Sequence, residues 1–554
     1  MAVAEGALIN AGIQAGLVDA ATVSRLRPLA RVQRCTLLEA VGRELRLPPS
    51  AFWQALARLR GLAWAELPQL AVTEAHQRRL PGVLLHKHAM MPMRDGQGRE
   101  WLVVTDPDDR LGPQAAARLL GTELPLALAD PEAMGALLQR ETGRAPAGAA
   151  RNAEEDATGL FDRLMKEALL RRATDVHVEA DEAGHLVRLR VDGVLQDWGL
   201  PLARALGDAL VSRIKVLAGM DISESRAPQD GALKYAAPGW DDAGVDLRVA
   251  SMPTLHGERL TLRLLGAGSG AALTLGALGM PAQVLQPLRG ILARPHGILL
   301  VTGPTGSGKS TTLYAALREL DCRRLNILTV EDPVEQQIPG ISQVGVGTKV
   351  GFADALRAFL RHDPDIILVG EVRDFDTADT ALKAAATGHL VLSTLHTNSA
   401  AGAVTRLVNL GCERYLIADT VAGVLAQRLV RRLCGRCALP AAPEPALCRA
   451  LGLPADTAAW PADIAPRQAV GCPHCLGTGY RGRTGIYEAL WIDAALADAL
   501  AAGASERELV RLARAQGRLH ALADDARAKL AAGLTTLHEV RPHLGRIEDS
   551  AEVD

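Results

Sequence analysis

The sequence predicts an α/β fold in which a parallel sheet carries helices on both faces and follows smaller α+β domains. The first observation is a series of short apolar runs that alternate with helical stretches, each followed at once by polar residues. These runs are GILLVT (297–302), NILTV (326–330), DIILV (365–369) and HLVLS (389–393). The second is a glycine-rich loop, GPTGSGKS (303–310), directly after the first run. The third is two Cys-x-x-Cys pairs, which predict a zinc-binding insertion.

Length and composition indicate a multidomain globular protein. A chain of 554 residues exceeds what one hydrophobic core supports, so we expect three or four domains. The net charge of −2 argues against a protein that binds nucleic acid, because such a protein usually carries one dominant sign of charge. The sequence has no apolar run long enough to span a bilayer and no basic leader. We therefore expect a cytoplasmic protein that reaches a membrane only through partner proteins.

Changes in composition divide the chain into segments. GRAPAGAARNAEEDAT (143–158) and GAGSGAA (266–272) lack a hydrophobic period, which is typical of linkers. Between them, LVRLRVDGVL (186–195) alternates apolar and polar residues, with Asp192-Gly193 as a hairpin turn. The expected segments are a first N-terminal domain (1–145), a linker (146–158), a second, PAS-like α+β N-terminal domain (159–272), the P-loop core (273–429), the tetracysteine insertion (430–488) and a C-terminal helical region (489–554).

The C-terminal region carries two patterns of helix starts. Ser505 with Glu508, and Thr536 with Glu539, each match the spacing of a capping box. We expect a helix to begin at each.

The glycine-rich loop matches the pattern G-x-x-x-x-G-K-[ST] between an expected strand and an expected helix. Its backbone N–H groups would wrap phosphates, and the helix N-terminus would favour negative charge there. Lys309 would reach the β- and γ-phosphates and the Ser310 hydroxyl would hold Mg²⁺. We expect ATP and Mg²⁺ as cofactors, with contacts from Gly303, Pro304, Thr305, Gly306, Ser307, Gly308, Lys309, Ser310 and Thr311.

Acidic residues follow two of the other apolar runs. NILTV leads into Glu331-Asp332 and then Glu335, and DIILV leads into Gly370-Glu371. Acids at strand ends beside a phosphate loop hold Mg²⁺ or orient the attacking water, which is what hydrolysis requires. The alternative is that they cap loops or pair with neighbouring arginines, and for Asp332 and Glu335 both interpretations stay open.

Four motifs in order resemble those of the secretion ATPases that drive type II secretion and type IV pilus assembly. They are GPTGSGKSTTLYAAL (303–317), TVEDPVEQQIPGISQV (329–344), RHDPDIILVGEVRD (361–374) and TGHLVLSTLHTN (387–398). The resemblance extends over roughly residues 158–540 and implies a RecA-like P-loop core. The segment 400–434 is closer to type II secretion than to pilus extension.

The resemblance implies roles for individual residues. Glu331 would polarise the lytic water, and Glu371 would act at the magnesium and water side. His396 would contact the γ-phosphate region, although a lone histidine at a strand end is more often structural. Arg248 and Arg263 of the second N-terminal domain would approach the nucleotide, where a guanidinium suits charge on the γ-phosphate. The alternative for both arginines is a solvated strand face.

The cysteine pairs consist of Cys434 with Cys437 and Cys472 with Cys475. Four thiolates at this spacing suit one closed, tetrahedral Zn²⁺ site, and members of the family that the chain resembles commonly carry such an insertion. The alternatives are redox-active pairs or inert thiols. His474 lies inside the second pair and is expected to be a bystander.

Residues 1–145 resemble the first N-terminal domain of the same family more loosely, through LPGVLLHKHAMMPMRDG (80–96) and WLVVTDPDD (101–109). The resemblance implies docking on an inner-membrane partner. Cyclic di-GMP binding is not expected, because Arg34 is followed by Thr36 where an Arg-x-Gly motif needs glycine.

The resemblance as a whole implies a homohexameric ATPase that powers type II secretion through pseudopilus assembly. One alternative is pilus extension on the same machinery. A DNA-uptake or conjugation motor is disfavoured by the near-neutral charge. A non-hydrolysing ATP-binding scaffold is disfavoured by Lys309, Glu331 and Glu371.

Overall fold

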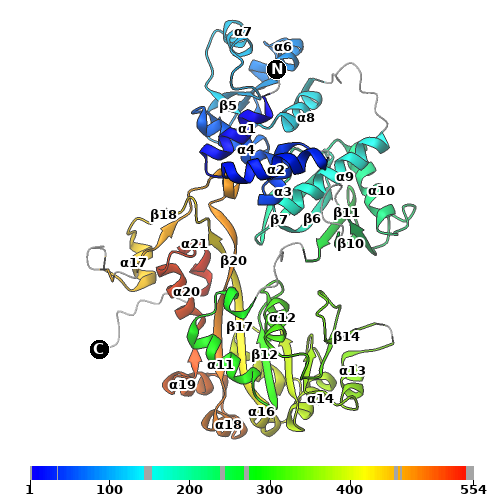
Figure 1. The fold of residues 1–554 in the computed structure, drawn as a ribbon, viewed down its shortest axis with the longest axis vertical. Helices are drawn as coiled ribbons and strands as arrows, with labels where there is room; N and C mark the ends of the chain where they lie inside the picture. Colours follow the sequence, from blue (N-terminus) through cyan, green and yellow to red (C-terminus); the bar gives the residue numbers. More distant parts are fainter. Residues whose placement is uncertain are drawn as a thin grey trace. The chain divides into compact units, whose positions relative to one another are not determined.

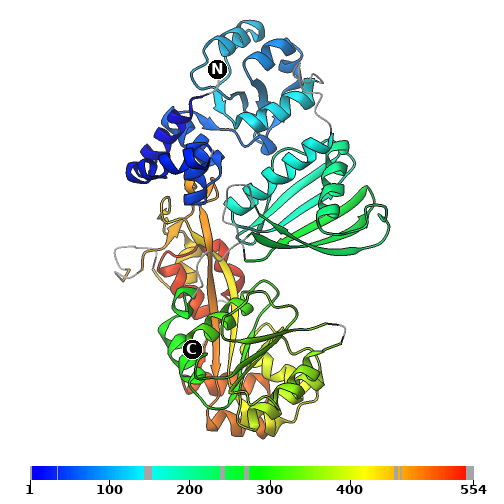
Figure 2. The ribbon, with the colours of Figure 1, turned by 45° about the vertical axis from the view of Figure 1, so that its right-hand side comes forward.

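The structure is a computed structural model, and Figures 1 and 2 show it as a ribbon in two orientations. It describes residues 3–33, 35–142, 153–236, 244–266, 274–347, 349–454, 460–461 and 464–544. The chain forms two compact units. The first comprises 1–268 with the short segment 471–479, and the second comprises 269–470 with 480–554.

The first unit begins with helices and a five-stranded sheet in the order β1-β5-β4-β3-β2. Its strands are β1 (Ala63–Trp64), β2 (Ala71–Val72), β3 (Met90–Arg94), β4 (Glu100–Val104) and β5 (Leu126–Leu128). Its helices are α1 (Glu5–Gln14), α2 (Ala20–Val32), α3 (Leu37–Leu45), α4 (Pro49–Leu59), α5 (Glu74–Gln77), α6 (Gly82–Lys87), α7 (Leu111–Leu120) and α8 (Pro131–Thr142). One hydrophobic cluster joins the helices to the sheet, with Phe52 and Met91 fully buried in it.

The same unit continues with a six-stranded antiparallel sheet in the order β8-β7-β6-β11-β10-β9. Val187 and Leu189 are buried in one hydrophobic cluster with residues of α9 (Ala153–Leu170) and α10 (Arg204–Leu217), as the alternating pattern predicted. Asp192 and Gly193, with φ of 49° and 92°, make the predicted hairpin turn. The elements are α9 (Ala153–Leu170), β6 (Ala173–Ala180), β7 (His185–Val191), β8 (Val194–Asp197), α10 (Arg204–Leu217), β9 (Gln229–Tyr235), β10 (Val245–Thr254) and β11 (Gly257–Leu264).

The start of α9 differs from the expectation for the linker. The helix begins at Ala153, inside the segment 146–158. The sequence there, Ala-Glu-Glu-Asp, begins with good helix formers. The rest of that linker and the expected joint at 267–272 lie outside the described residues.

The second unit is built on an eight-stranded sheet in the order β14-β13-β15-β16-β12-β17-β20-β21. The four predicted apolar runs form β12, β13, β15 and β16, which pair in parallel. The strands are β12 (Gly297–Thr302), β13 (Ile327–Glu331), β14 (Ser342–Gly345), β15 (Ile366–Val369), β16 (Leu390–Leu395), β17 (Val421–Leu433), β20 (Tyr480–Trp491) and β21 (Leu519–His520).

Helices cover both faces of this sheet, as Figures 1 and 2 show. Ile298 and Leu300 contact one cluster, and their neighbours Leu299 and Val301 contact the other. Helices α11 (Ala282–Leu292) and α12 (Lys309–Glu319) contribute to the Leu299 side. The Ile298 side is covered by α13 (Phe352–Phe359), α14 (Phe375–Ala386), α15 (Ala400–Asn409), α16 (Arg414–Thr420), α18 (Ala494–Ala501) and α19 (Glu506–Ala515).

The sheet extends beyond the expected limits of the core, 273–429, and is mixed rather than purely parallel. Strand β17 runs on to Leu433, and β20 begins at Tyr480 and pairs with it antiparallel. The described insertion between them carries β18 (Leu439–Pro440), α17 (Pro445–Leu451) and β19 (Arg467–Gln468). Helices α20 (Leu522–Ala531) and α21 (Leu537–Val540) follow β21.

Candidate functional site

The phosphate loop joins β12 to α12 and depends on glycine at three positions. Gly303, Gly306 and Gly308 have φ of 148°, 78° and 88°, in the left-handed region that favours glycine. A Cβ on Gly303 would lie 2.5 Å from the backbone oxygen of Gln427. Side chains are therefore excluded from this part of the loop, which leaves backbone N–H groups to line it.

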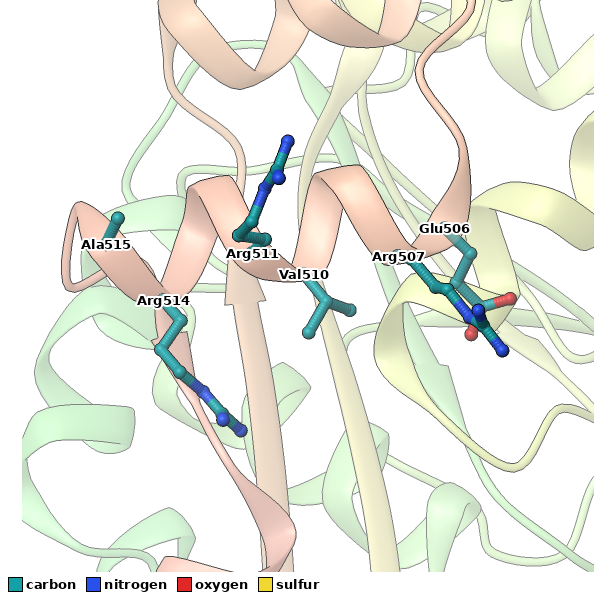
Figure 3. Close-up of a pocket in the computed structure, with 6 residues that line it drawn as sticks. All are labelled: Glu506, Arg507, Val510, Arg511, Arg514 and Ala515. Carbon is teal, nitrogen blue, oxygen red and sulfur yellow. The ribbon is translucent and has the colours of Figure 1, made fainter. Parts of the chain in front are cut away.

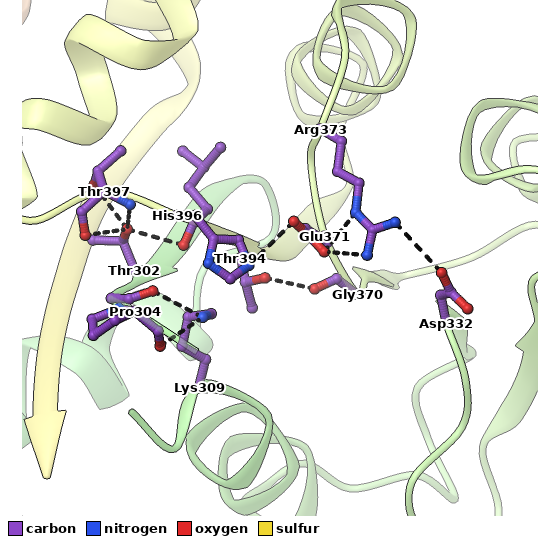
Figure 4. Close-up of polar contacts among 12 residues, drawn as sticks. Thr302, Pro304, Lys309, Asp332, Gly370, Glu371, Arg373, Thr394, His396 and Thr397 are labelled. Carbon is purple, nitrogen blue, oxygen red and sulfur yellow. Dashed lines mark hydrogen bonds and ion pairs between the residues drawn. The ribbon is translucent and has the colours of Figure 1, made fainter. Parts of the chain in front are cut away.

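Lys309 lies at the first position of α12 and points back over the loop (Figure 4). Its Nζ donates to the backbone oxygens of Gly303, at 2.9 Å, and Pro304, at 3.3 Å. Burial lowers the pKa of Lys309, while the nearby Glu371 carboxylate acts in the opposite direction. The Ser307 hydroxyl is buried and has no hydrogen-bond partner among the described residues. A cradle of this kind, with one ammonium group and an unsatisfied hydroxyl, fits a phosphate.

Gln427 supports the loop from β17, and the sequence analysis missed it. Its Nε2 donates to the Ser307 backbone oxygen at 2.7 Å, and its Oε1 accepts from Thr312 Oγ1 at 2.8 Å. The side chain is buried, so it fixes the loop against the start of α12. A lone glutamine in an apolar strand gave no signal, because its partners lie more than a hundred residues away in the chain.

Glu371 follows β15 and makes polar contacts through both carboxylate oxygens (Figure 4). Oε2 lies 2.7 Å from Arg373 Nη2, and Oε1 lies 3.2 Å from His396 Nε2. Arg373 also lies 3.6 Å from Asp332 Oδ2. Glu371 and Asp332 therefore do pair with an arginine, which was the alternative interpretation of these acids. His396 joins the same cluster, so it is not isolated at its strand end.

Glu331, the last residue of β13, is buried at 5% exposure and accepts hydrogen bonds from three side chains. Thr329 Oγ1 donates at 2.6 Å and Gln343 Nε2 at 3.1 Å, both to Oε1. The Tyr314 hydroxyl donates to Oε2. Neutral donors satisfy this carboxylate, whereas the guanidinium of Arg373 binds that of Glu371.

The sheet order brings these groups to one edge. Strands β13, β15, β16 and β12 are consecutive neighbours and run parallel, so their carboxyl ends lie side by side. Glu331, Glu371, His396 and the phosphate loop follow these four ends. Ser310 follows Lys309 at the start of α12, so the edge combines phosphate-binding groups with oxygen ligands that suit Mg²⁺.

Arg248 and Arg263 belong to the first unit and face each other directly across β10 and β11. Arg263 Nε donates to Asp175 Oδ1 at 3.1 Å, although 63% of its side chain remains exposed. Arg248 is exposed and makes no ion pair within the described part of the chain. Two exposed guanidinium groups side by side provide a surface for an anion.

The four expected zinc ligands come together. The sulfur atoms of Cys434, Cys437, Cys472 and Cys475 all lie within 4.8 Å of one another. Cys437 is half-buried and the others are buried. A hydrogen bond with Cys472 and burial raise the pKa of the Cys475 thiol, so a bound cation would have to displace its proton. Four convergent sulfur atoms fit a structural Zn²⁺ site.

A separate hollow runs along α19 at the surface of the second unit (Figure 3). Arg507, Arg511 and Arg514 line it together with Val510. Glu506, at the helix start, accepts a hydrogen bond from Ser399 Oγ at 3.0 Å. The hollow shares no residue with the phosphate site.

Two models of known protein families match the chain. The model for "Type II/IV secretion system protein" matches residues 152–542, and that for the MshEN domain matches residues 60–147. The chain belongs to the type II/IV secretion system protein family.

Individual relatives agree with this assignment. Type II secretion system protein E of Pseudomonas aeruginosa is 42% identical over 505 residues, covering 86% of this chain and 98% of the relative. Type II secretion system ATPase E of Vibrio cholerae is 47% identical, covering 70% and 75% respectively. The type IV pilus assembly ATPase PilB of Thermus thermophilus is 38% identical, covering 89% and 57%.

Among solved structures, the Legionella pneumophila ATPase DotB superposes with a TM-score of 0.52 at 22% identity. It covers 72% of this chain and 97% of its own, and supports the fold alone. Across the ranges that the structure describes, no helix combines the length and apolarity needed to cross a membrane.

Proposed function

We propose that the protein is an ATP-hydrolysing motor of type II secretion. The observation that carries this proposal is the convergence of Lys309, Glu331, Glu371 and His396 at one sheet edge beside the phosphate loop. An ammonium group and backbone amides bind phosphates, and carboxylates beside them hold Mg²⁺ and orient water, which together suit hydrolysis.

Each residue has a proposed part. The loop 303–311 binds the phosphates, with Lys309 at the β- and γ-phosphates. Ser310 and Glu371 would hold Mg²⁺, which would supply positive charge beside the phosphates, and Glu371 would also act on the attacking water. Glu331 orients and polarises the attacking water, and His396 contacts the γ-phosphate side while bound to Glu371.

The assembly is proposed on the strength of the family. A homohexamer would let Arg248 and Arg263 approach a nucleotide and stabilise transition-state charge. The first N-terminal domain would dock on an inner-membrane component, so the protein would be cytoplasmic and peripheral to that membrane. Type II secretion is favoured over pilus extension because the E proteins are 42% and 47% identical and PilB 38%.

Replacing Lys309 with alanine tests the proposal. Its Nζ contacts only backbone oxygens of its own loop, so Lys309→Ala should leave the melting temperature unchanged. Turnover should fall by about 10²-fold or more, because the charge on the phosphates is lost. Phosphate release is measured on the full chain, with and without single-stranded DNA. Lys383→Ala is the control, since Lys383 is an exposed lysine of the same unit paired with Asp379.

Two outcomes would count against the proposal. Turnover of Lys309→Ala within a few fold of wild type would show that the phosphate site is elsewhere. Strong stimulation of wild-type turnover by single-stranded DNA would favour a DNA motor.

A further inference from the structure

The contacts of Glu331 reach into the phosphate-loop helix. Its carboxylate is buried, and no lysine or arginine pairs with it in the portion of the chain that the structure describes. The three donors come from three segments: Tyr314 from α12, Thr329 from β13 and Gln343 from β14. A buried carboxylate is stable only when hydrogen bonds replace its lost water, so these donors determine where it points.

Tyr314 is the donor that connects Glu331 to the nucleotide loop. It lies five residues after Lys309 on α12 and is itself 3% exposed. Its hydroxyl donates to Glu331 Oε2 and accepts the backbone N–H of Glu335 at 3.1 Å. Burial and the Glu331 carboxylate raise the pKa of Tyr314, so the hydroxyl keeps its proton and remains a donor.

Arg318 extends this contact by one helical turn. Its Nη2 donates to Gln336 Oε1 at 2.7 Å, and Gln343 Nε2 donates to the backbone oxygen of Gln336 at 2.9 Å. One face of α12 therefore holds the acidic segment 331–336 through two side chains. A displacement of the start of α12 would be transmitted to Glu331 through these bonds.

We propose that Tyr314 is a positioning residue, which fixes the direction of the Glu331 carboxylate and couples it to the helix that begins at Lys309. This inference rests on the proposed role of Glu331 in hydrolysis. Tyr314 does not itself touch the reacting atoms in this assignment. It acts by restricting Glu331, because a carboxylate that loses one of three fixed donors gains rotational freedom at the sheet edge.

The test is a double-mutant cycle of Tyr314→Phe and Glu331→Gln. Phenylalanine keeps the buried ring and removes only the hydroxyl. Tyr314→Phe should lower kcat about 10-fold and leave the Kd for ATP within about 2-fold, because general-base catalysis depends on placement. In the Glu331→Gln background the same change should cause little further loss of turnover, because residues that act as a unit are non-additive.

A second readout needs no nucleotide. The two substitutions should be non-additive in the melting temperature of the nucleotide-free chain, since Tyr314→Phe removes the donor of a hydrogen bond whose charged acceptor Glu331→Gln neutralises. Tyr487→Phe is the matched control: Tyr487 is buried in the same unit and its hydroxyl donates to the Leu278 backbone oxygen at 2.9 Å. Loss of the Tyr487 hydroxyl should lower the melting temperature about as much as loss of the Tyr314 hydroxyl, and it should leave kcat unchanged.

The outcomes separate this inference from the proposed function. Wild-type kcat in Tyr314→Phe with inactive Glu331→Gln would overturn the inference and leave the role of Glu331 intact. Wild-type kcat in Glu331→Gln would overturn that role itself. If Tyr314→Phe and Glu331→Gln lower turnover independently and additively, Tyr314 contributes to packing and does not position Glu331. If Tyr314→Phe does not fold, Thr329→Val, which removes another donor to the same carboxylate, should give the same non-additivity.

Discussion

Glu371 divides its carboxylate between Arg373 and His396, and this division determines what a substitution would change. Arg373 Nε and Nη2 both bind Oε2, at 2.8 and 2.7 Å, which leaves Oε1 to His396. A glutamine could keep an oxygen for Arg373 and would lose the negative charge. Shape and orientation would be retained while the electrostatic contribution disappeared.

Glu371→Gln should therefore bind ATP within a few fold of wild type and lose turnover by about 10²-fold or more. Nucleotide binding is followed by titration and turnover by phosphate release. Glu319→Gln is the control, because Glu319 makes a similar two-bond contact with Arg289 in the same unit. Loss of ATP binding together with turnover would make Glu371 mainly a magnesium ligand.

At the scale of elements, two equal capping patterns have different outcomes. Ser505 and Glu508 form the predicted capping box at α19. Thr536 occupies the N-cap of α21, so a helix begins there as predicted, but its side chain makes no capping hydrogen bond. Glu539 binds Arg431 on β17 instead, and Thr536 Oγ1 lies 2.8 Å from the Tyr480 hydroxyl on β20. The side chains of Thr536 and Glu539 therefore bond with residues of the sheet rather than with each other's backbone.

The cysteine cluster gives a prediction for the insertion. Elemental analysis should find about one zinc per chain, because four thiolates fill one tetrahedral site. Cys434→Ser should lose that metal and lower the free energy of unfolding by several kcal/mol, roughly, since metal binding is coupled to folding. Cys448→Ser is the control: Cys448 is a buried cysteine of α17 outside the cluster and should keep the metal. A metal-free preparation with unchanged melting would show that the cysteines are inert thiols.

At the scale of the whole molecule, the arginines and the phosphate loop belong to different units. Arg248 and Arg263 are held by the strands of one unit, and Lys309 by the loop of the other. In the proposed homohexamer, assembly would bring these arginines to the nucleotide. Within the first unit, Arg263 Nε donates to Asp175 Oδ1 at 3.1 Å.

Arg248→Ala and Arg263→Ala should each lower turnover by roughly 10³-fold and change ATP affinity much less, as for arginines that act on transition-state charge. Specific activity of the wild type should also rise with protein concentration until assembly is complete. Phosphate release is measured for each protein over a dilution series. Arg204→Ala is the control, because Arg204 of the same unit binds backbone oxygens of His256 and Asp181.

One result would contradict the proposal that arginines of the first unit act on a nucleotide bound by the second. Constant specific activity down to the monomer, with both arginine variants near wild type, would mean that the site is complete within the second unit.

Local patterns in the sequence were sufficient for the features that depend on neighbours in the chain. The four apolar runs, the phosphate loop that requires glycine at Gly303 and Gly308, and the hairpin at Asp192-Gly193 all follow from short-range sterics and periodicity. The cysteine spacing likewise predicted a cluster that the structure brings within 4.8 Å. These features depend on glycine, which tolerates a positive φ, and on paired cysteines, which bind metal through their thiolates.

Only the tertiary structure decided which distant side chains serve the site. Gln427 reaches the phosphate loop because β17 pairs with β12, and Tyr314 reaches Glu331 because α12 and β13 contribute to one hydrophobic cluster. Arg373 meets both Glu371 and Asp332 because β15 pairs with β13. Strand order and helix packing set these contacts through long-range burial, and a glutamine, tyrosine or arginine has no local pattern that reports such partners.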